Sequence, residues 1–174
     1  MAAGNTYIPL ATTTLSSIAS SYTFSSISGS YTDLVLVGSN LKSDTNDRGC
    51  KLQFNGDTTS TYAAYYLIGY NNTVTAARDA VQTFIQWLGF NLGLSTTTNV
   101  GTIVTNILNY SNTTKHKTVL NRGSYKNNTL GPESYSQVST WRSTAAITSI
   151  TVSISGSGSF AVGSSFTLYG IAAA

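Results

Sequence analysis

The chain has 174 residues, a length that fits one domain with a substantial core. Only 9% of its residues are charged, against roughly 25% in an average soluble domain, whereas it holds 25 Ser and 27 Thr. A net charge of +3 is too small for the dense basic face that nucleic acids require, and no apolar stretch approaches the roughly 20 residues of a membrane-spanning helix. The composition predicts a single all-β domain over residues 1–174 with no nucleic-acid or membrane partner.

Apolar residues that alternate or run together predict strands in the first half of the chain, at 22–25, 32–39, 51–54 and 61–70. The most charged loop, 40–50, separates the second strand from the third. Asn55-Gly56 is the strongest short hairpin signal and is expected to join the third strand to the fourth, which Asn71-Asn72 ends.

Residues 76–88 are ambiguous. Val81, Ile85 and Leu88 lie on one face of a helix, yet the residues around them also alternate as a strand does. Because strand signals surround this segment, we expect a strand at 83–90, preceded by a short helical turn.

Further strands are expected at 100–109, 117–122, 135–141, 147–154 and 165–171. The last two alternate apolar with hydroxyl residues and flank a Gly-Ser turn at 156–159, which predicts a closing β-hairpin. Eight to ten such strands indicate a jelly-roll-like β-sandwich, or a barrel. The expected core comprises Leu34, Leu36, Phe54, Ile150, Val152, Phe166 and Leu168.

Catalytic residues are scarce. His116, Glu133 and Cys50 are the single representatives of their types. A nucleophilic pair of Cys50 with His116 would need the two side chains in contact. We instead expect His116 in an exposed turn and Cys50 as a buried thiol at a strand edge, and the chain is predicted not to be an enzyme.

Metal ligands are equally sparse. The segment Asp44, Asn46, Asp47 begins like a calcium loop, but Arg48 and Asn55 occupy positions where that loop needs an acid or amide and a glutamate. Zinc would need several His and Cys residues. We expect a solvated loop here, and neither a metal nor a cofactor.

Positive charge gathers at residues 80–132, which hold four cations and no acid. Residues 112–126 are expected to form a hairpin that projects this charge. Its candidate partner-binding residues are Lys115, His116, Lys117, Arg122 and Lys126.

Eleven tyrosines and two tryptophans suit either sugar stacking or a protein interface. Tyr62, Tyr65, Tyr66 and Tyr70 cluster in one predicted strand, where Tyr65 and Tyr66 must face opposite ways.

Three segments of the chain carry a family resemblance: Tyr31 to Gly38, Leu52 to Asp57, and Thr144 to Ile171 with its S-x-F-x-L-Y-G-I close. Together with the region of Asn109 they make nearly the whole chain resemble a family of bacteriophage virion structural proteins that is frequent in cyanophages. The resemblance implies a virion component, and no catalytic motif of the family carries over to this sequence.

The resemblance leaves two positions on the particle open. A small module without a fibrous shaft suits a capsid decoration (cement) protein that stabilises the outer surface of the shell. Its partners would then be the major capsid protein and other copies of itself, as a homotrimer. The alternative is a tail, fibre or adaptor component that binds a glycan or receptor. The basic segment would meet an acidic capsid patch in the first case and lie at an exposed tip in the second.

Overall fold

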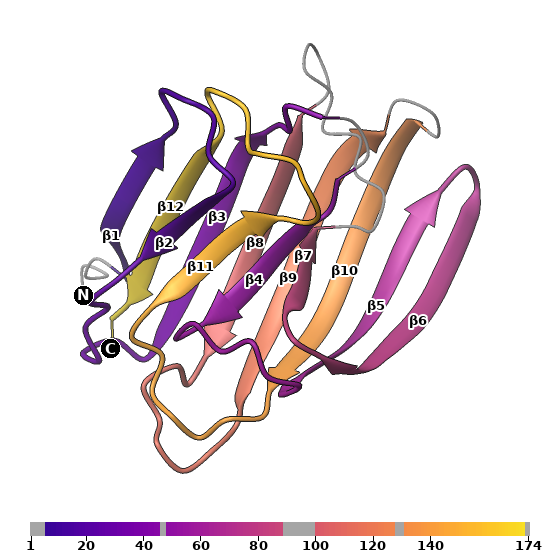
Figure 1. Cartoon of the computed structure of the whole chain (residues 1–174). Coiled ribbons are helices and arrows are strands. Elements are labelled where there is room, and N and C mark those ends of the chain that lie inside the picture. Colours follow the sequence, from indigo (N-terminus) through magenta and orange to yellow (C-terminus); the bar gives the residue numbers. More distant parts are fainter. Residues whose placement is uncertain (1–5, 46–47, 89–99, 128–130, 173–174) are drawn as a thin grey trace, which may run out of the picture.

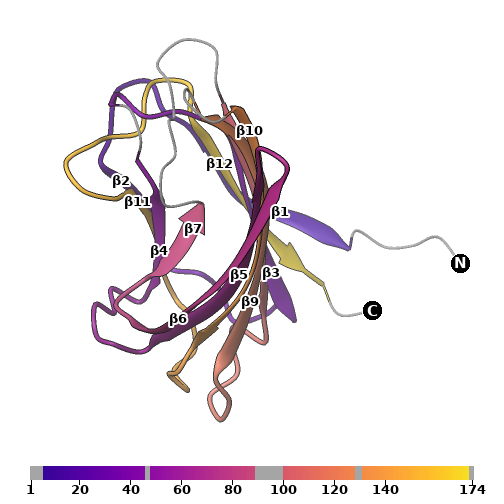
Figure 2. The ribbon, with the colours of Figure 1, turned by 90° about the vertical axis from the view of Figure 1, so that its right-hand side faces the viewer.

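The computed structural model describes residues 6–45, 48–88, 100–127 and 131–172. Every regular element in these ranges is a strand, and none of them holds a helix long and apolar enough to cross a bilayer. The strands form two antiparallel sheets packed face to face, which confirms the predicted all-β sandwich (Figures 1 and 2).

The large sheet has eight strands (Figure 1). In spatial order they are β1 (Tyr7–Thr14), β12 (Ser165–Ile171), β3 (Asp33–Leu41), β8 (Gly101–Leu108), β9 (Lys117–Asn127), β10 (Gly131–Trp141), β5 (Tyr62–Tyr70) and β6 (Thr73–Gln82). The small sheet has four, in the order β2 (Ser21–Phe24), β11 (Ile150–Ile154), β4 (Cys50–Phe54) and β7 (Ile85–Leu88). Because the small sheet has half as many strands, it covers only part of the large one, and β6 lies beyond its cover (Figure 1).

The core lies between the sheets, and all seven residues predicted to be in it are buried. Aromatic rings fill part of it, where Phe166 packs against Phe160 with ring centroids 4.9 Å apart and against Trp87 at 6.2 Å. Trp87 lies directly over Gly38, where a Cβ atom would come within 2.7 Å of its ring. A glycine at this point of β3 therefore makes room for the indole.

The predicted closing hairpin is wrong. β11 pairs with β2 and β4 in the small sheet, whereas β12 pairs with β1 and β3 in the large one. Residues 155–164 thus cross from one sheet to the other, held by the buried ring of Phe160 and its backbone bridges to Ala19 and Ser43. The alternation correctly identifies two strands, but two strands that face one core from opposite sheets show the same pattern as a hairpin.

The turn at Asn55-Gly56 also joins strands of different sheets, so the hairpin predicted there is wrong as well. Both residues have positive φ, as such a turn requires. The Asn55 side chain accepts hydrogen bonds from the N–H groups of Thr148 (2.8 Å) and Ser149 (3.1 Å) and donates one to the Ala146 carbonyl (2.7 Å). Asn55 therefore anchors the chain that enters β11.

Residues 73–88 form two strands, β6 and β7, rather than a helical turn and a strand. Asn71 and Asn72, with φ of 44° and 60°, make the tight turn of a true hairpin between β5 and β6. The apolar residues that suggested a helix divide between exposed Val81 on β6 and buried Ile85 and Leu88 on β7. Residues 89–90 of the predicted strand lie outside the described residues.

Candidate functional site

The outer face of the large sheet spans eight strands, and the small sheet packs on the opposite side (Figure 2). Alternate residues of each strand point to it, and most are hydroxylic or apolar. Its exposed charges are Arg78, Arg122 and Lys126. The outer face is therefore weakly charged, and its charge is positive.

Several carboxylates of the described chain are held by local hydrogen bonds. Asp33 accepts from the N–H of Asn109 at 2.7 Å, and Asp44 accepts from the N–H of Ser159, also at 2.7 Å. Glu133 is buried and accepts from the Tyr125 hydroxyl. Asp33 begins β3, Asp44 lies in a loop and Glu133 lies in the core, so none of the three is on β6 or β9, the strands that carry the exposed cations.

The five predicted partner-binding residues do not form one patch, because the expected hairpin at 112–126 is wrong. Lys115 and His116 are exposed in the turn between β8 and β9, and Arg122 and Lys126 are exposed on β9 itself. From residue 117 to residue 126 a single strand spans on the order of 30 Å. A partner that binds the outer face would meet Arg122 and Lys126 but not the turn.

Lys117 is not a surface residue at all, which corrects its assignment as a partner-binding group. Its side chain is fully buried, with Nζ donating to the carbonyls of Lys115 (2.9 Å) and Thr144 (3.3 Å) and lying 6.0 Å from the centre of the Trp141 ring. Burial lowers the pKa of this ammonium group. The sequence places Lys117 beside two exposed residues but does not reveal that the strand pleat turns it inward.

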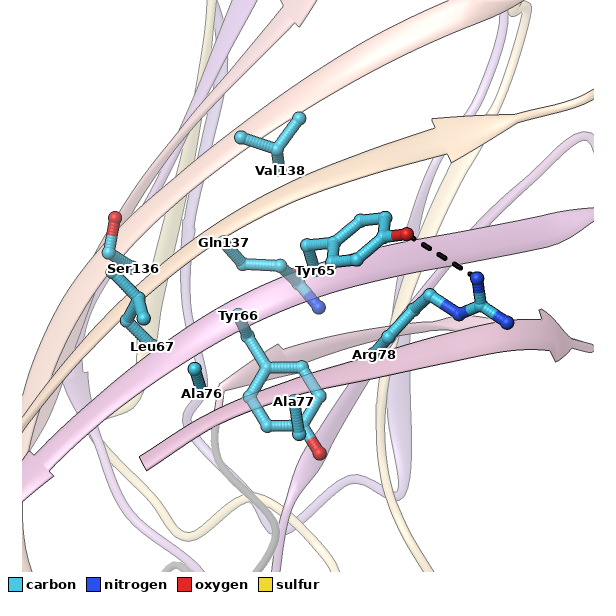
Figure 3. A pocket seen from close by; sticks show the side chains of 9 residues that line it. All are labelled: Tyr65, Tyr66, Leu67, Ala76, Ala77, Arg78, Ser136, Gln137 and Val138. Atoms are coloured by element: carbon cyan, nitrogen blue, oxygen red, sulfur yellow. Dashed lines mark hydrogen bonds between the residues drawn. The ribbon is translucent and has the colours of Figure 1, made fainter. Parts of the chain in front are cut away.

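A shallow groove of about 430 Å³ crosses the outer face over β10, β5 and β6 (Figure 3). Its exposed lining side chains come from alternate positions of the three strands: Tyr65, Leu67, Ala76, Arg78, Ser136 and Val138. The residues between them, Tyr66, Ala77 and Gln137, are less exposed and contribute to the floor. The groove is mostly apolar, with an aromatic ring and a guanidinium group at one end.

Tyr65 and Arg78 form that end. The Tyr65 side chain is 63% exposed, Arg78 Nη1 donates to its hydroxyl at 3.4 Å, and the guanidinium carbon lies 5.9 Å from the ring centre (Figure 3). Tyr66 faces the other way and stacks on buried Tyr135, with ring centroids 6.2 Å apart, as the strand pleat predicted. Sequence reasoning identified Tyr65 but missed Arg78, because β6 was not predicted as a strand.

A row of polar side chains runs through the core on the inner face of β8, β9 and β10, and its last member, Gln137, also lines the groove. Trp87 Nε1 donates to Thr105 Oγ1 (2.6 Å), which donates to Asn121 Oδ1 (2.7 Å), and Asn121 Nδ2 donates to Gln137 Oε1 (2.5 Å). Buried atoms with no hydrogen-bond partner remain at Glu133 Oε1, Gln137 Nε2 and Ser139 Oγ. The row was not predicted, since polar residues inside a strand pattern are normally assigned to its exposed face.

The remaining reactive groups lie apart. Cys50 is fully buried in β4, and burial raises the pKa of its thiol well above the usual range. His116 is exposed in its turn. Among the described residues no group of three or more His, Cys, Asp or Glu is placed to hold a metal ion. Of the segment that begins like a calcium loop and was expected to be a solvated loop, Asn46 and Asp47 lie outside the described residues.

Comparison with known proteins gives no assignment. The sequence significantly matches no family model and no curated protein, and the fold significantly matches no solved structure.

Proposed function

We propose that the chain is a bacteriophage virion structural protein and, within that class, a capsid decoration protein that binds the major capsid protein on the outside of the shell. The sequence resemblance described above suggests the class. The observation that carries the decoration role is the outer face of the large sheet, a broad, weakly charged surface with exposed apolar side chains and exposed cations.

The three segments that carry the resemblance lie together in the fold, which supports their being the framework of one module. Tyr31 to Gly38 enters β3, and Thr144 to Ile171 contains both β11 and β12. β3 pairs with β12, β4 pairs with β11, and Asn55 joins the second segment to the third. A resemblance confined to surface loops would not connect neighbouring strands in this way.

The strand order also supports a jelly-roll interpretation of the sandwich. β1-β12-β3-β8 and β2-β11-β4-β7 would be its two four-stranded sheets, and β9, β10, β5 and β6 would extend the first. Jelly rolls are common in viral capsid proteins and in lectins.

The experiment measures association with undecorated capsids. Reversing Arg122 and Lys126 to Glu should slow association, most strongly at low ionic strength, because exposed charges act mainly on the association rate. The matched control is Lys115→Glu, which reverses an exposed charge in the turn, away from the outer face. If the control slows association as much as the double reversal, the outer face is not the binding surface.

Heat stability of the particle tests the role itself. Particles without the protein should release DNA at a lower temperature than decorated ones. Particles that are equally heat-stable but fail to adsorb to cells would overturn the decoration role and favour the second candidate function.

The second candidate is a tail, fibre or adaptor component that binds a glycan. The groove favours it, because the exposed Tyr65 ring offers a stacking surface and Arg78 and Ser136 offer hydrogen-bond donors beside it. Tyr65→Ala should then abolish adsorption to host cells while leaving capsid heat stability unchanged. Tyr7→Ala is the control, since Tyr7 is similarly exposed, at 59%, on the opposite edge strand.

We also propose self-association, as the homotrimer expected from the sequence. The exposed apolar side chains of the outer face support an interface between copies but do not fix its symmetry. Sedimentation of the purified protein, together with the copy number on the particle, tests it, and an even-numbered assembly without a three-fold component would exclude it.

A further inference from the structure

The strand β6 ends the large sheet with an open edge. It pairs with β5 on one side and with no described strand on the other (Figure 1). Its side chains are exposed or half-buried throughout, and Val74 is 72% exposed. Ten residues of unpaired backbone at a sheet edge are a template for another strand.

The opposite edge of the same sheet is protected. β1 carries Pro9, and its pairing with β12 shifts register between Pro9 and Ala11. A proline and a bulge are standard ways in which proteins prevent strand addition. β6 contains no proline and only two charged residues, Arg78 and Asp79, and its one register shift lies beyond Asp79. Of the two edges, β6 is therefore the one able to accept a strand.

The hairpin turn shows which backbone groups are available. Asn71 and Asn72 have the positive φ values of a type I′ turn, so the backbones of Tyr70 and Thr73 bond to each other. Along an antiparallel strand, the backbone N–H and C=O groups of successive residues point alternately to one side of the strand and to the other. The N–H and C=O groups of Val74, Ala76 and Arg78 accordingly point to the open edge.

We propose that β6 pairs antiparallel with β6 of a second copy of this chain, about a two-fold axis through Ala77. In this register Ala76 lies opposite the partner subunit's Arg78, and Val74 lies opposite the partner subunit's Ala80. Residues in opposed positions share a face, so each copy's groove continues into the other's. The inference is independent of the proposed function.

Side-chain pairing favours a second copy as the partner of β6 and disfavours one neighbouring register. Shifting the pair by two residues along β6 would place Arg78 directly opposite itself, which is unfavourable because like charges would face each other. In the proposed register Asp79 instead lies opposite the partner subunit's Thr75, whose hydroxyl can donate to it. Asp79 is half-buried on the inner face, where no described residue hydrogen-bonds its carboxylate. The second copy thus supplies the donor that the single chain lacks.

A cysteine on the axis tests the register. Ala77 would face its own copy in a pair without backbone hydrogen bonds, where Cα atoms lie about 4.5 Å apart, within disulfide range. Ala77→Cys should therefore form a covalent dimer under mild oxidation. Val74→Cys is the control, because its two copies would lie about 20 Å apart. The native Cys50 is buried and does not compete. A Val74→Cys dimer that forms as readily as the Ala77→Cys dimer would overturn the register.

Sedimentation equilibrium at tens of micromolar tests the contact without a cross-link. We expect an even number of chains, two for β6 pairing alone or six where trimers pair across this edge. Ala76→Pro removes an edge N–H but no bond to β5, and should reduce the mass to one chain or three. Unchanged mass with native circular dichroism would overturn the proposal, as would a wild-type protein of one or three chains.

A charge exchange keeps the proposal testable if Ala76→Pro fails to fold. Thr75→Asp places two carboxylates opposite each other at both ends of the pair and should weaken dimerisation about tenfold. Adding Asp79→Thr restores a Thr–Asp pair at each end and should recover the affinity. Absence of recovery in a folded double variant would overturn the proposed pairing. If Thr75→Asp abolishes binding to the shell but leaves the sedimentation mass unchanged, the β6 edge binds a shell protein instead of a second copy.

Discussion

On the inner face of the large sheet, β3 and β12 present only apolar side chains and glycines to the small sheet, whereas β9 and β10 present amide, hydroxyl, carboxyl and ammonium groups among their aromatic rings. The apolar half is stabilised by burial, which depends little on direction. The polar half depends on hydrogen bonds between its buried groups, although single atoms of Glu133, Gln137 and Ser139 have no partner among the described residues. Substitutions of similar size should therefore destabilise the apolar half through lost packing contacts, and the polar half by leaving buried groups without a hydrogen-bond partner.

The largest effect is expected in the apolar half. Phe166→Ala should lower the free energy of unfolding by about 3–5 kcal/mol, because the ring is fully buried between Phe160, Trp87 and Tyr22. Denaturant unfolding measures the loss. The control is Val162→Ala, on the crossing segment but 54% exposed, which should cost less than about 0.5 kcal/mol. A loss below about 1 kcal/mol for Phe166→Ala would contradict the packing described for this half.

A smaller effect is expected at the centre of the polar half. Asn121→Leu removes the link between Thr105 and Gln137 and should cost about 1–3 kcal/mol, since their hydrogen-bonding atoms stay buried. The double variant Asn121→Leu with Gln137→Leu should lose less than the sum of the two single variants. Additive losses in denaturant unfolding would show that the two amides act independently.

At the end of the polar half, Asp57 should make stability depend on acid pH. Burial alone would raise the pKa of Asp57, but hydrogen bonds from Thr59, Thr61 and Trp141 outweigh it and hold the pKa below its usual range. Because the folded pKa is the lower one, this stabilisation is present above the unfolded value of about 3.9 and is lost as the pH falls below it. Asp57→Asn should lower the free energy of unfolding by about 1 kcal/mol at pH 7. It should also make the loss of stability between pH 5 and 2 smaller than in the wild type. An unchanged acid profile would contradict this role.

The smallest effect is expected at Lys117. Because burial lowers its folded pKa, the unfolded chain holds more protons just below the unfolded value of about 10.4. Stability gained from this group should therefore rise with pH through that window. Buried tyrosines such as Tyr62, whose pKa is raised to about 12, act in the opposite direction, so the measurement is the difference between wild type and Lys117→Met. As the pH rises through this window, the free energy of unfolding of the wild type should increase relative to that of Lys117→Met, by less than about 1 kcal/mol. A shift toward the variant would mean that Lys117 is not desolvated.

The sequence predicts the apolar half far better than the polar half. Alternation identifies a strand and its buried face, which is why Ile150, Phe166 and Leu168 are placed correctly. It does not say to which sheet a strand belongs, because both sheets face one core, and so two hairpins were predicted where the chain crosses. The inward position of Lys117 and the Asn121 network depend on contacts between strands distant in sequence, which no local pattern encodes.

The pairing of β1 with β12 sets the order in which this sandwich can be completed. Ile8 lies opposite Gly170, and β12 is an internal strand between β1 and β3. The partner that β1 needs is therefore synthesised more than 150 residues after it. Loops of this length close slowly, and topologies rich in such distant pairs fold in milliseconds to seconds. During translation the first strand must stay unpaired until residue 171 has left the ribosome, and a chain stopped before Ser165 would leave both β1 and β3 as open edges.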